Sequence, residues 1–568
     1  MIKKLLPLIL IIILSWWAIN SLFHTGFFPM HDDEQIARLY ELHQTLINGQ
    51  FPPRWISNLG FGFGYPFYNF YPPLVYYFGE VFHLIGINLI LSTKLVIILG
   101  TLLSGIFIYL LAKEFFGRIG GIIAAIFYIY TPYHALDLYV RGALAEFFSG
   151  VFIPACLWST VRLIRTKDIK WLIINSVFLS CLVLSHNLIA IAFIPFYLLW
   201  IVFFLFKEQK RKRSTYLLLG SIILAFGLSA YFALPAIIEK KYTLVDTILT
   251  GELASYKLHF VYLRQFWNSP WGYGGSIYGL HDGMSFEVGK IHLILAILGG
   301  ILGFYHIFKK EKTGLQFTFF FILFLLSLFM ASFHSDFIWS KIQPLWYLQF
   351  PWRFLIFASI FASLLAGRII DYFMRITRIH RGIKWSLVII VIVTVIILNK
   401  DYFQPARYLE VSDRNYTSKE DLQWRVSKMS FEYVPKGVRT VYSDIGTTQI
   451  DITKAELPEK SFKSSAVATI IEIVNKPHFK KYQVSGSGTI LTINTYNFPG
   501  WEVTLDDQKV DINDNNKFKL ITIKVPKGEH MVIAQFNNTP IRTIGNSITL
   551  SSIILLILLI IWRKNKKF

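Results

Sequence analysis

A cluster of acids near the N-terminus is the part of this sequence best suited to do chemistry. Residues 29 to 42 read PMHDDEQIARLYEL, so Asp32, Asp33 and Glu34 come directly before a helical pattern of apolar residues. Acids in this place can cap a helix and complement its dipole. Capping explains one acid well but three acids less well, and a carboxylate here can also take a proton from an acceptor hydroxyl. On the residues alone, capping and general-base catalysis by Asp32 or Glu34 both stay open.

Two arginines stand at the ends of apolar segments, at the outer edge of the predicted membrane region. Arg141 and Arg353 carry the planar fork of donors that suits phosphate oxygens. Ionisable residues at membrane-buried positions are functional candidates by default. The alternative is that Arg141 pairs with Glu146, about one turn further along, and that Arg353 only anchors its helix.

Other polar and aromatic residues extend the candidate substrate-binding set. His186 and Asn187 join two apolar segments, where they either form a turn or contact phosphate or sugar. Trp271 lies in a glycine-rich loop, where it either stacks on a sugar ring or belongs to the aromatic belt of a membrane interface. His31 and Arg38, which lie in the acidic motif, complete the set.

The histidines do not indicate a metal site. A zinc centre needs three or four closely placed ligands, whereas the histidines nearest the candidate residues are spread over separate segments: His31, His134, His186, His259 and His281. The sequence therefore predicts no certain cofactor, and a divalent cation is compatible with it but not indicated.

The elements that must position these residues are membrane helices. The 568-residue chain is 54% hydrophobic and only 16% charged, with a mean hydropathy of +0.48. Its formal charge of +21 would suggest nucleic acid in a soluble chain. Here Lys and Arg in cytoplasmic loops and attraction to anionic lipid headgroups explain the charge better. We expect a multi-pass protein of the cell membrane that contacts lipids and no nucleic acid.

About twelve apolar segments approach the roughly 20 residues that a spanning helix needs. The first is expected to be an uncleaved span, because no small-residue cleavage site follows it. Pro72 to Gly86 is assigned to a helix on the membrane surface, since counting it as a span would reverse the side of every later loop. The predicted spans are roughly 5 to 23, 88 to 112, 119 to 134, 142 to 162, 170 to 186, 188 to 206, 215 to 238, 289 to 308, 314 to 332, 352 to 374, 383 to 399 and 546 to 562.

Basic loops give the orientation, because loops rich in Lys and Arg stay in the cytoplasm. The basic loops include Lys207 to Arg213 and the tail from Arg563 to Lys567. Both termini are then cytoplasmic. The predicted outward segments are 24 to 87, 135 to 141, 239 to 288, 333 to 351 and 400 to 545.

The longest outward segment contains a predicted β domain. Between about residues 466 and 536, apolar and polar residues alternate in short runs such as Thr489 to Thr495, Glu502 to Leu505 and Leu520 to Val525. Such runs, separated by turn signals, predict an antiparallel β-sandwich. Trp501 can be a sugar-stacking residue, but a core or turn aromatic is favoured. The expected division is a membrane domain over 1 to 400, a mainly β domain over 401 to 545, and a last helix with a basic tail over 546 to 568.

Several long motifs occur in one order along nearly the whole chain. They include GQFPPRWISNLGFGFGYPFYNFYPPLVYY (49 to 77), LYVRGALAEFF (138 to 148), LSHN (184 to 187), FALPAIIEKKYT (232 to 243), NSPWGYGGS (268 to 276), HDGMSFEVG (281 to 289) and IWSKIQPLWYLQFPWRFL (338 to 355). Together with the acidic motif over 29 to 42, these motifs resemble the bacterial membrane family labelled "6-pyruvoyl-tetrahydropterin synthase-related". More broadly, they resemble the GT-C superfamily of lipid-linked sugar transferases. The pterin label itself is discounted, since such a synthase is a soluble enzyme with a histidine-ligated zinc.

With about twelve predicted transmembrane helices and large outward loops the expected fold is GT-C-like, and the GT-C resemblance also implies a chemistry. Such enzymes take a sugar from a polyprenyl phosphate and use an acid of the first outward loop as base. Matched to the HD-x-E pattern, the base would be Asp32, with Glu34 second and Asp33 less favoured. The resemblance thus predicts an inverting glycosyltransferase that acts on an extracytoplasmic glycan, lipid or protein acceptor. The alternative is a non-catalytic transporter or assembly factor for envelope polymers. The sequence identifies neither the donor sugar nor the acceptor.

Overall fold

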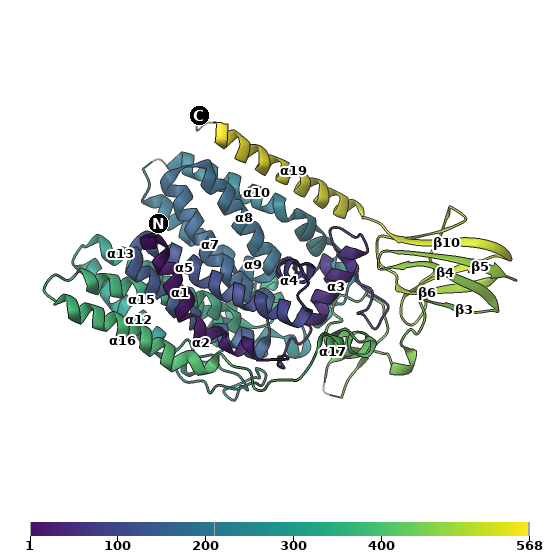
Figure 1. Cartoon of the computed structure of the whole chain (residues 1–568), viewed down its shortest axis with the longest axis horizontal. Helices are drawn as coiled ribbons and strands as arrows, with labels where there is room; N and C mark the ends of the chain where they lie inside the picture. Colours follow the sequence, from purple (N-terminus) through teal and green to yellow (C-terminus); the bar gives the residue numbers. More distant parts are fainter. Residues whose placement is uncertain (1, 210, 445, 566–568) are drawn as a thin grey trace.

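The protein consists of a body of long helices with a β-sandwich projecting from one end (Figure 1). The computed structural model describes residues 2–209, 211–444 and 446–565. Lys210 of the predicted basic loop, and the predicted tail beyond residue 565, lie outside the described residues. The long helices are α1 (Ile2–Leu14), α5 (Leu89–Ile129), α7 (Leu144–Thr166), α8 (Ile169–Ser185), α9 (Asn187–Phe206), α10 (Arg211–Ile238), α12 (Lys290–Phe308), α13 (Lys312–Ala331), α15 (Leu355–Arg375), α16 (Arg381–Asn399) and α19 (Pro540–Asn565).

The helices in the described part of the chain are those of a multi-pass membrane protein. It contains nine helices that are long and apolar enough to cross a membrane, or ten if the bent pair at the N-terminus is one span. The apolar helix α8 is shorter, with 17 residues. All the apolar segments predicted from the sequence are helical, and two of them lie within α5.

Helix α5 is a hairpin rather than one rod. A straight helix of its 41 residues would be about 60 Å long. Its two halves instead lie against each other: a Cβ on Gly121 would lie 2.8 Å from Tyr109, and a Cβ on Gly105 would lie 2.5 Å from Ile129. The chain reverses at Gly117, whose φ of 69° suits glycine. The reversal lies between the two spans predicted over 88 to 112 and 119 to 134.

The first predicted span, 5 to 23, is bent rather than straight. Its two parts, Leu5–Leu14 and Trp16–Phe23, meet at 48°. The second part begins with α2 (Trp16–Ile19). The bend falls at Ser15, whose hydroxyl donates to the Ile11 carbonyl at 2.7 Å. Side-chain bonds of this kind to the preceding turn often bend helices.

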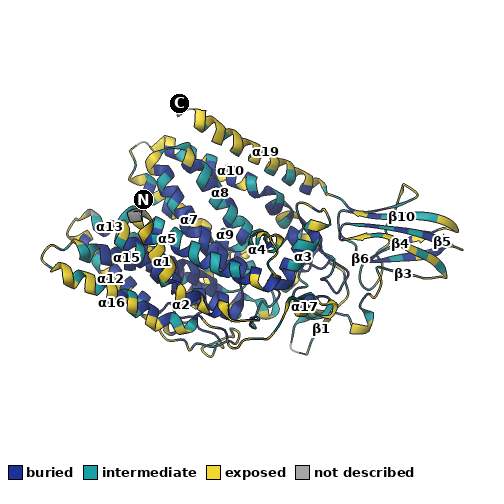
Figure 2. Ribbon diagram, in the orientation of Figure 1, coloured by how far each residue is buried: buried dark blue, intermediate teal, exposed yellow. Residues whose placement is uncertain are grey.

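Burial separates the centre of the body from its lipid-facing rim. In the most apolar stretch of the span that contains α15, 94% of residues are buried, compared with 11% in α19. Figure 2 shows α16 and α19 with long exposed faces, and these faces carry Ile, Leu and Val side chains. Exposed apolar residues over such lengths are those expected of helices that contact lipid.

Shorter elements gather at the end of the body that carries the sandwich. They include α3 (Gln35–Ile47), α4 (Leu74–Leu84), α6 (Pro132–Ala135) and a π-helix, η3 (Leu136–Arg141). The helix predicted over 72 to 86 is present as α4, which packs against α3 and α5. The segment from 239 to 288 forms short 3-10 turns, the one-turn helix α11 (Val245–Ile248) and irregular chain.

The predicted β-sandwich is confirmed. Two antiparallel sheets are present, with strand orders β4-β5-β10-β7-β8 and β3-β6-β9. The strands are β3 (Phe462–Ser464), β4 (Ala468–Lys476), β5 (Phe479–Gly486), β6 (Thr489–Tyr496), β7 (Trp501–Leu505), β8 (Gln508–Val510), β9 (Leu520–Val525) and β10 (Gly528–Phe536). Alternate residues of β6 and β9 are buried in the core of the sandwich, among them Leu491, Ile493, Ile521 and Ile523. A separate hairpin joins β1 (Thr440–Tyr442) to β2 (Thr448–Ile450).

Candidate active site

The acidic motif is fixed beside Arg141 by backbone pairing. The His31 amide donates to the Val140 carbonyl at 3.0 Å, and the Asp32 amide donates to the Arg141 carbonyl at 2.7 Å. Gly142 follows with a φ of 68°, and a Cβ there would lie 2.0 Å from the Met30 sulfur. A glycine is therefore required where the two segments meet.

Asp32 does not act as a helix cap. Helix α3 begins at Gln35, and its N-cap residue, Glu34, makes no side-chain capping bond. The Asp32 backbone carbonyl accepts from Gln35, but its carboxylate forms no hydrogen bond or ion pair with any residue that the structure describes. The side chain lines a cavity and is partly exposed, so this carboxylate is free to meet a ligand.

The two neighbouring acids have different surroundings. Asp33 forms an ion pair with Arg425 at 3.1 Å and does not line the cavity; burial raises its pKa to about 6 against the opposing effect of Arg425. Glu34 is 4% exposed, and its Oε2 lies 3.8 Å from Arg38. Burial raises the pKa of Glu34 to about 7, because Arg38 offsets only part of the desolvation and Asp32 adds repulsion.

The arginines form a buried cluster with two acids. Arg141 donates to Asp137 and, at 2.8 Å, to Glu146. The Arg353 Nε lies 3.0 Å from the same Glu146 oxygen, and the Arg141 guanidinium lies 4.4 Å from the centre of the Trp352 ring. The structure therefore contains the pairing of Arg141 with Glu146 that the sequence left open. Arg141 also lines a cavity. We call Asp137, Arg141, Glu146 and Arg353 the cavity cluster.

One cavity of about 820 Å³ brings most of the predicted site together. Its lining includes nine of the predicted site residues: His31, Asp32, Glu34, Arg38, Arg141, Glu146, His186, Asn187 and Arg353. His31 Nε2 lies 3.1 Å from the Tyr273 carbonyl. His186 accepts from the Ile189 amide through Nδ1, so it both caps α9 and faces the cavity.

Trp271 is not part of this cavity. Its ring stacks on Tyr402 with centroids 4.5 Å apart, and the residue is absent from the cavity wall. The local sequence could not show this, because the contact joins a loop to a segment more than a hundred residues further along the chain.

Glu432 and Lys240 also line the cavity and were not identified from the sequence. Burial raises the pKa of Glu432, and the Arg38 charge counteracts this. Lys240 contacts Asp246 at 3.2 Å. Lys240 lies in the motif over 232 to 243 but was given no role there, and Glu432 lies in none of the motifs. The proximity of residues 34, 38 and 432 arises only from folding.

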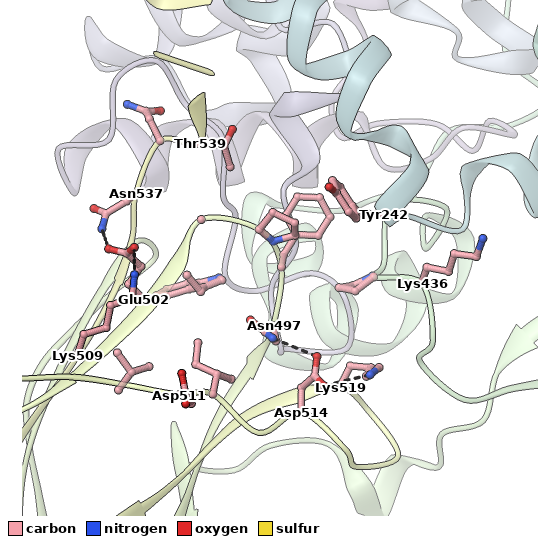
Figure 3. Close-up of a pocket in the computed structure, with 18 of the residues that line it drawn as sticks. Tyr242, Lys436, Asn497, Glu502, Lys509, Asp511, Asp514, Lys519, Asn537 and Thr539 are labelled. Atoms are coloured by element: carbon pink, nitrogen blue, oxygen red, sulfur yellow. Dashed lines mark hydrogen bonds and ion pairs between the residues drawn. The ribbon is translucent and has the colours of Figure 1, made fainter. Parts of the chain in front are cut away.

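A second cavity of about 750 Å³ lies at the joint between the helical body and the sandwich (Figure 3). Two carboxylates that line it are hydrogen-bonded. The Glu502 carboxylate accepts from Asn537 at 2.8 Å and from Lys509 at 2.5 Å. The Asp514 carboxylate accepts from Asn497 and from Lys519, both at 3.1 Å.

Trp501 borders the second cavity and is packed in the core. It is only 5% exposed and packs edge-on against Trp55 with ring centroids 5.2 Å apart. This contact supports the prediction of a core or turn aromatic over that of a sugar-stacking residue.

Within residues 2–209, 211–444 and 446–565, no group of three or more His, Cys, Asp or Glu side chains is placed to hold a metal ion.

A family model and one curated relative match parts of the chain. The model described as "Dolichyl-phosphate-mannose-protein mannosyltransferase" matches residues 71–232. An uncharacterized protein of Lactococcus lactis subsp. cremoris is 28% identical over 207 residues, which are 35% of this chain and 34% of the relative. The chain therefore matches about a third of the length of that relative. None of the comparisons supports the pterin-synthase label.

Solved structures show a loose likeness. The Archaeoglobus fulgidus oligosaccharyltransferase is 12% identical, with 71% of this chain and 53% of that chain covered and a TM-score of 0.40. The mycobacterial arabinofuranosyltransferase AftD is 12% identical, with 72% and 28% covered and a TM-score of 0.45. ArnT from Cupriavidus metallidurans, solved with undecaprenyl phosphate, is 13% identical, with 70% and 64% covered and a TM-score of 0.37. At such scores these likenesses carry no argument about activity.

Proposed function

We propose that the protein is a GT-C type inverting glycosyltransferase. It moves a sugar from a polyprenyl phosphate to a hydroxyl group of an extracytoplasmic glycan, lipid or protein. The observation that carries this proposal is the unpaired carboxylate of Asp32 in the same cavity as Arg141 and Arg353. The family match over residues 71–232 supports the class of reaction.

In the proposed reaction, each side of the cavity has its own task. The acceptor oxygen attacks the anomeric carbon of the sugar while Asp32 takes the hydroxyl proton. The bond between that carbon and the phosphate oxygen breaks, and its electron pair leaves with the polyprenyl phosphate. Arg141 and Arg353 stabilise the phosphate through charge-assisted hydrogen bonds.

The charge of the cavity suits an anionic donor. Four cationic side chains line it, namely Arg38, Arg141, Lys240 and Arg353, against the carboxyl groups of Asp32, Glu34, Glu146 and Glu432. Burial raises the pKa of Glu34 to about 7 and that of Glu432 above its ordinary value. Both shifts reduce the negative charge that faces the four cationic side chains, which favours a phosphate.

The proposal is tested by Asp32→Asn, because asparagine keeps the size of the side chain but cannot take the proton. We expect transfer to fall by about 10²- to 10⁴-fold, with folding unchanged. Mass spectrometry of lipid extracts should then show a polyprenyl-phosphate sugar that accumulates as it does in cells without the protein. Asp33→Asn is the matched control, since Asp33 lies outside the cavity and should leave the lipid profile as in wild type.

Two results would redirect the proposal. If Asp32→Asn behaved as wild type while Glu34→Gln lost transfer, Glu34 would be the base. If neither substitution nor their combination changed the lipid profile, the enzyme assignment would give way to a transporter or assembly factor.

A further inference from the structure

A separate groove of about 630 Å³ lies beside the first span. It runs between the end of that span and the first turns of α5, and the segment around Ser412 closes it. Its apolar wall consists of Leu22, Phe23, Ile90, Leu91, Leu95 and Ile98. Phe23 and Leu91 are 62% and 44% exposed, so the groove opens on the lipid-facing surface. It shares no lining residue with the 820 Å³ cavity.

A buried lysine lies in this groove without a counter-charge. Lys94 is 4% exposed, and its ammonium donates to the His24 carbonyl at 2.6 Å. A lysine ammonium has three donors, and in the described part of the chain Lys94 forms no ion pair. Burying a charge without a partner is costly, so a ligand that supplies negative charge would offset this cost.

The rest of the charged lining is consistent with an anionic ligand. Arg414 is exposed at the rim and, within the described residues, makes no hydrogen bond or ion pair. Asp413 is the one carboxylate among the lining residues, but its oxygens accept from the Leu89 and Ile90 amides at 2.8 and 3.1 Å. That carboxylate is thus engaged by the helix N-terminus, and the positive charges of Lys94 and Arg414 stay available.

We propose that this groove binds the headgroup of an anionic phospholipid. The phosphate would lie between Lys94 and Arg414, and the first carbons of an acyl chain would lie on the apolar wall. The combination of an apolar wall, a buried ammonium and an exposed guanidinium fits a lipid phosphate of the surrounding bilayer. The assignment is independent of the transferase proposal, because it concerns a different groove and needs no reaction.

Native mass spectrometry of the full-length protein tests this assignment, with phosphatidylglycerol and phosphatidylcholine as probes. Wild type should retain phosphatidylglycerol in preference to phosphatidylcholine. Lys94→Met keeps an unbranched side chain, one atom shorter, but removes its charge, and should weaken phosphatidylglycerol binding by about tenfold or more. Arg414→Gln, at an exposed position, should weaken it by only a few fold.

Lys113→Met is the matched control, because Lys113 lies on the same helix, is exposed and does not line the groove. It should bind phosphatidylglycerol as wild type does. Should Lys94→Met fail to give a folded species, Arg414→Gln decides the question. Equal binding of both lipids by wild type, or unchanged phosphatidylglycerol binding in both Lys94→Met and Arg414→Gln, would overturn the assignment.

Discussion

Two of the buried groups of ion pairs differ in how completely their polar atoms are used. At the joint between body and sandwich, Arg542 donates to Glu239, to the Asn537 carbonyl and to the Pro499 carbonyl at 2.9, 3.2 and 2.8 Å. Both oxygens of Glu239 are bonded, to Thr539 on one side and to Asn69 and Arg542 on the other. We call Glu239 and Arg542 the joint pair.

The cavity cluster is less complete. Asp137 Oδ2 and Arg353 Nε are buried without a hydrogen bond, although that Nε lies within ion-pair distance of Glu146, and Arg353 lines the cavity. A fully bonded pair such as the joint pair holds segments together and leaves nothing to offer a ligand. Open polar atoms beside a cavity are those that a substrate can complete, which is why the cavity cluster is the better candidate for function.

Removing one member of the joint pair should have the largest effect on stability. Arg542→Met leaves Glu239 charged and buried, and loss of one partner from a buried pair typically costs about 3–5 kcal/mol. We expect a markedly lower melting temperature in detergent. Lys509→Met is the control, because its ion pair with Glu502 is exposed and should contribute less than about 1 kcal/mol. Equal melting temperatures for the two variants would show that the joint pair is not structural.

Arg353→Gln should have the opposite profile, with a small effect on folding and a larger effect on the ligand. Glu146 keeps its bond to Arg141 in this variant, so no buried acid is left alone. Loss of a charged hydrogen bond to phosphate costs about 1.5–3 kcal/mol, which corresponds to roughly 10- to 100-fold weaker binding. Binding of undecaprenyl phosphate to the purified protein measures this. A variant that bound the lipid normally but melted far lower would place Arg353 with the structural pairs.

The same comparison explains what the sequence could predict. The spans, the reversal near Gly117 and the strands around Leu491 and Ile521 follow from apolar periodicity and turn residues, which are local signals. Asp32 and Arg141 were identified from their residue types and from the resemblance to GT-C enzymes, which implies one shared site for base and phosphate. Their proximity depends on the pairing of residues 31–32 with 140–141 through a π-helix, and Glu432 enters the cavity from a segment that carries no motif. Such contacts arise from tertiary packing and leave no periodic trace in the sequence.

The last prediction concerns the pH dependence of donor binding and has the smallest expected effect. Burial raises the pKa of Glu34 to about 7, so this carboxyl group is mostly protonated at pH 6 and mostly charged at pH 8. Because ionisation adds a negative charge to the cavity, affinity for a phosphate should fall by a few fold as the pH rises through 7, as expected for one charge acting through a partly solvated cavity.

Glu34→Gln isolates this contribution, because it keeps the side chain's size and stays neutral at every pH. At each pH its affinity for undecaprenyl phosphate should be that of a protein in which residue 34 is uncharged. The phosphate itself titrates in this range, so the comparison is the ratio of variant to wild-type affinity at each pH, which should rise through pH 7. A ratio that stayed constant would mean that the charge of Glu34 does not reach the phosphate, and would remove this acid from the donor site.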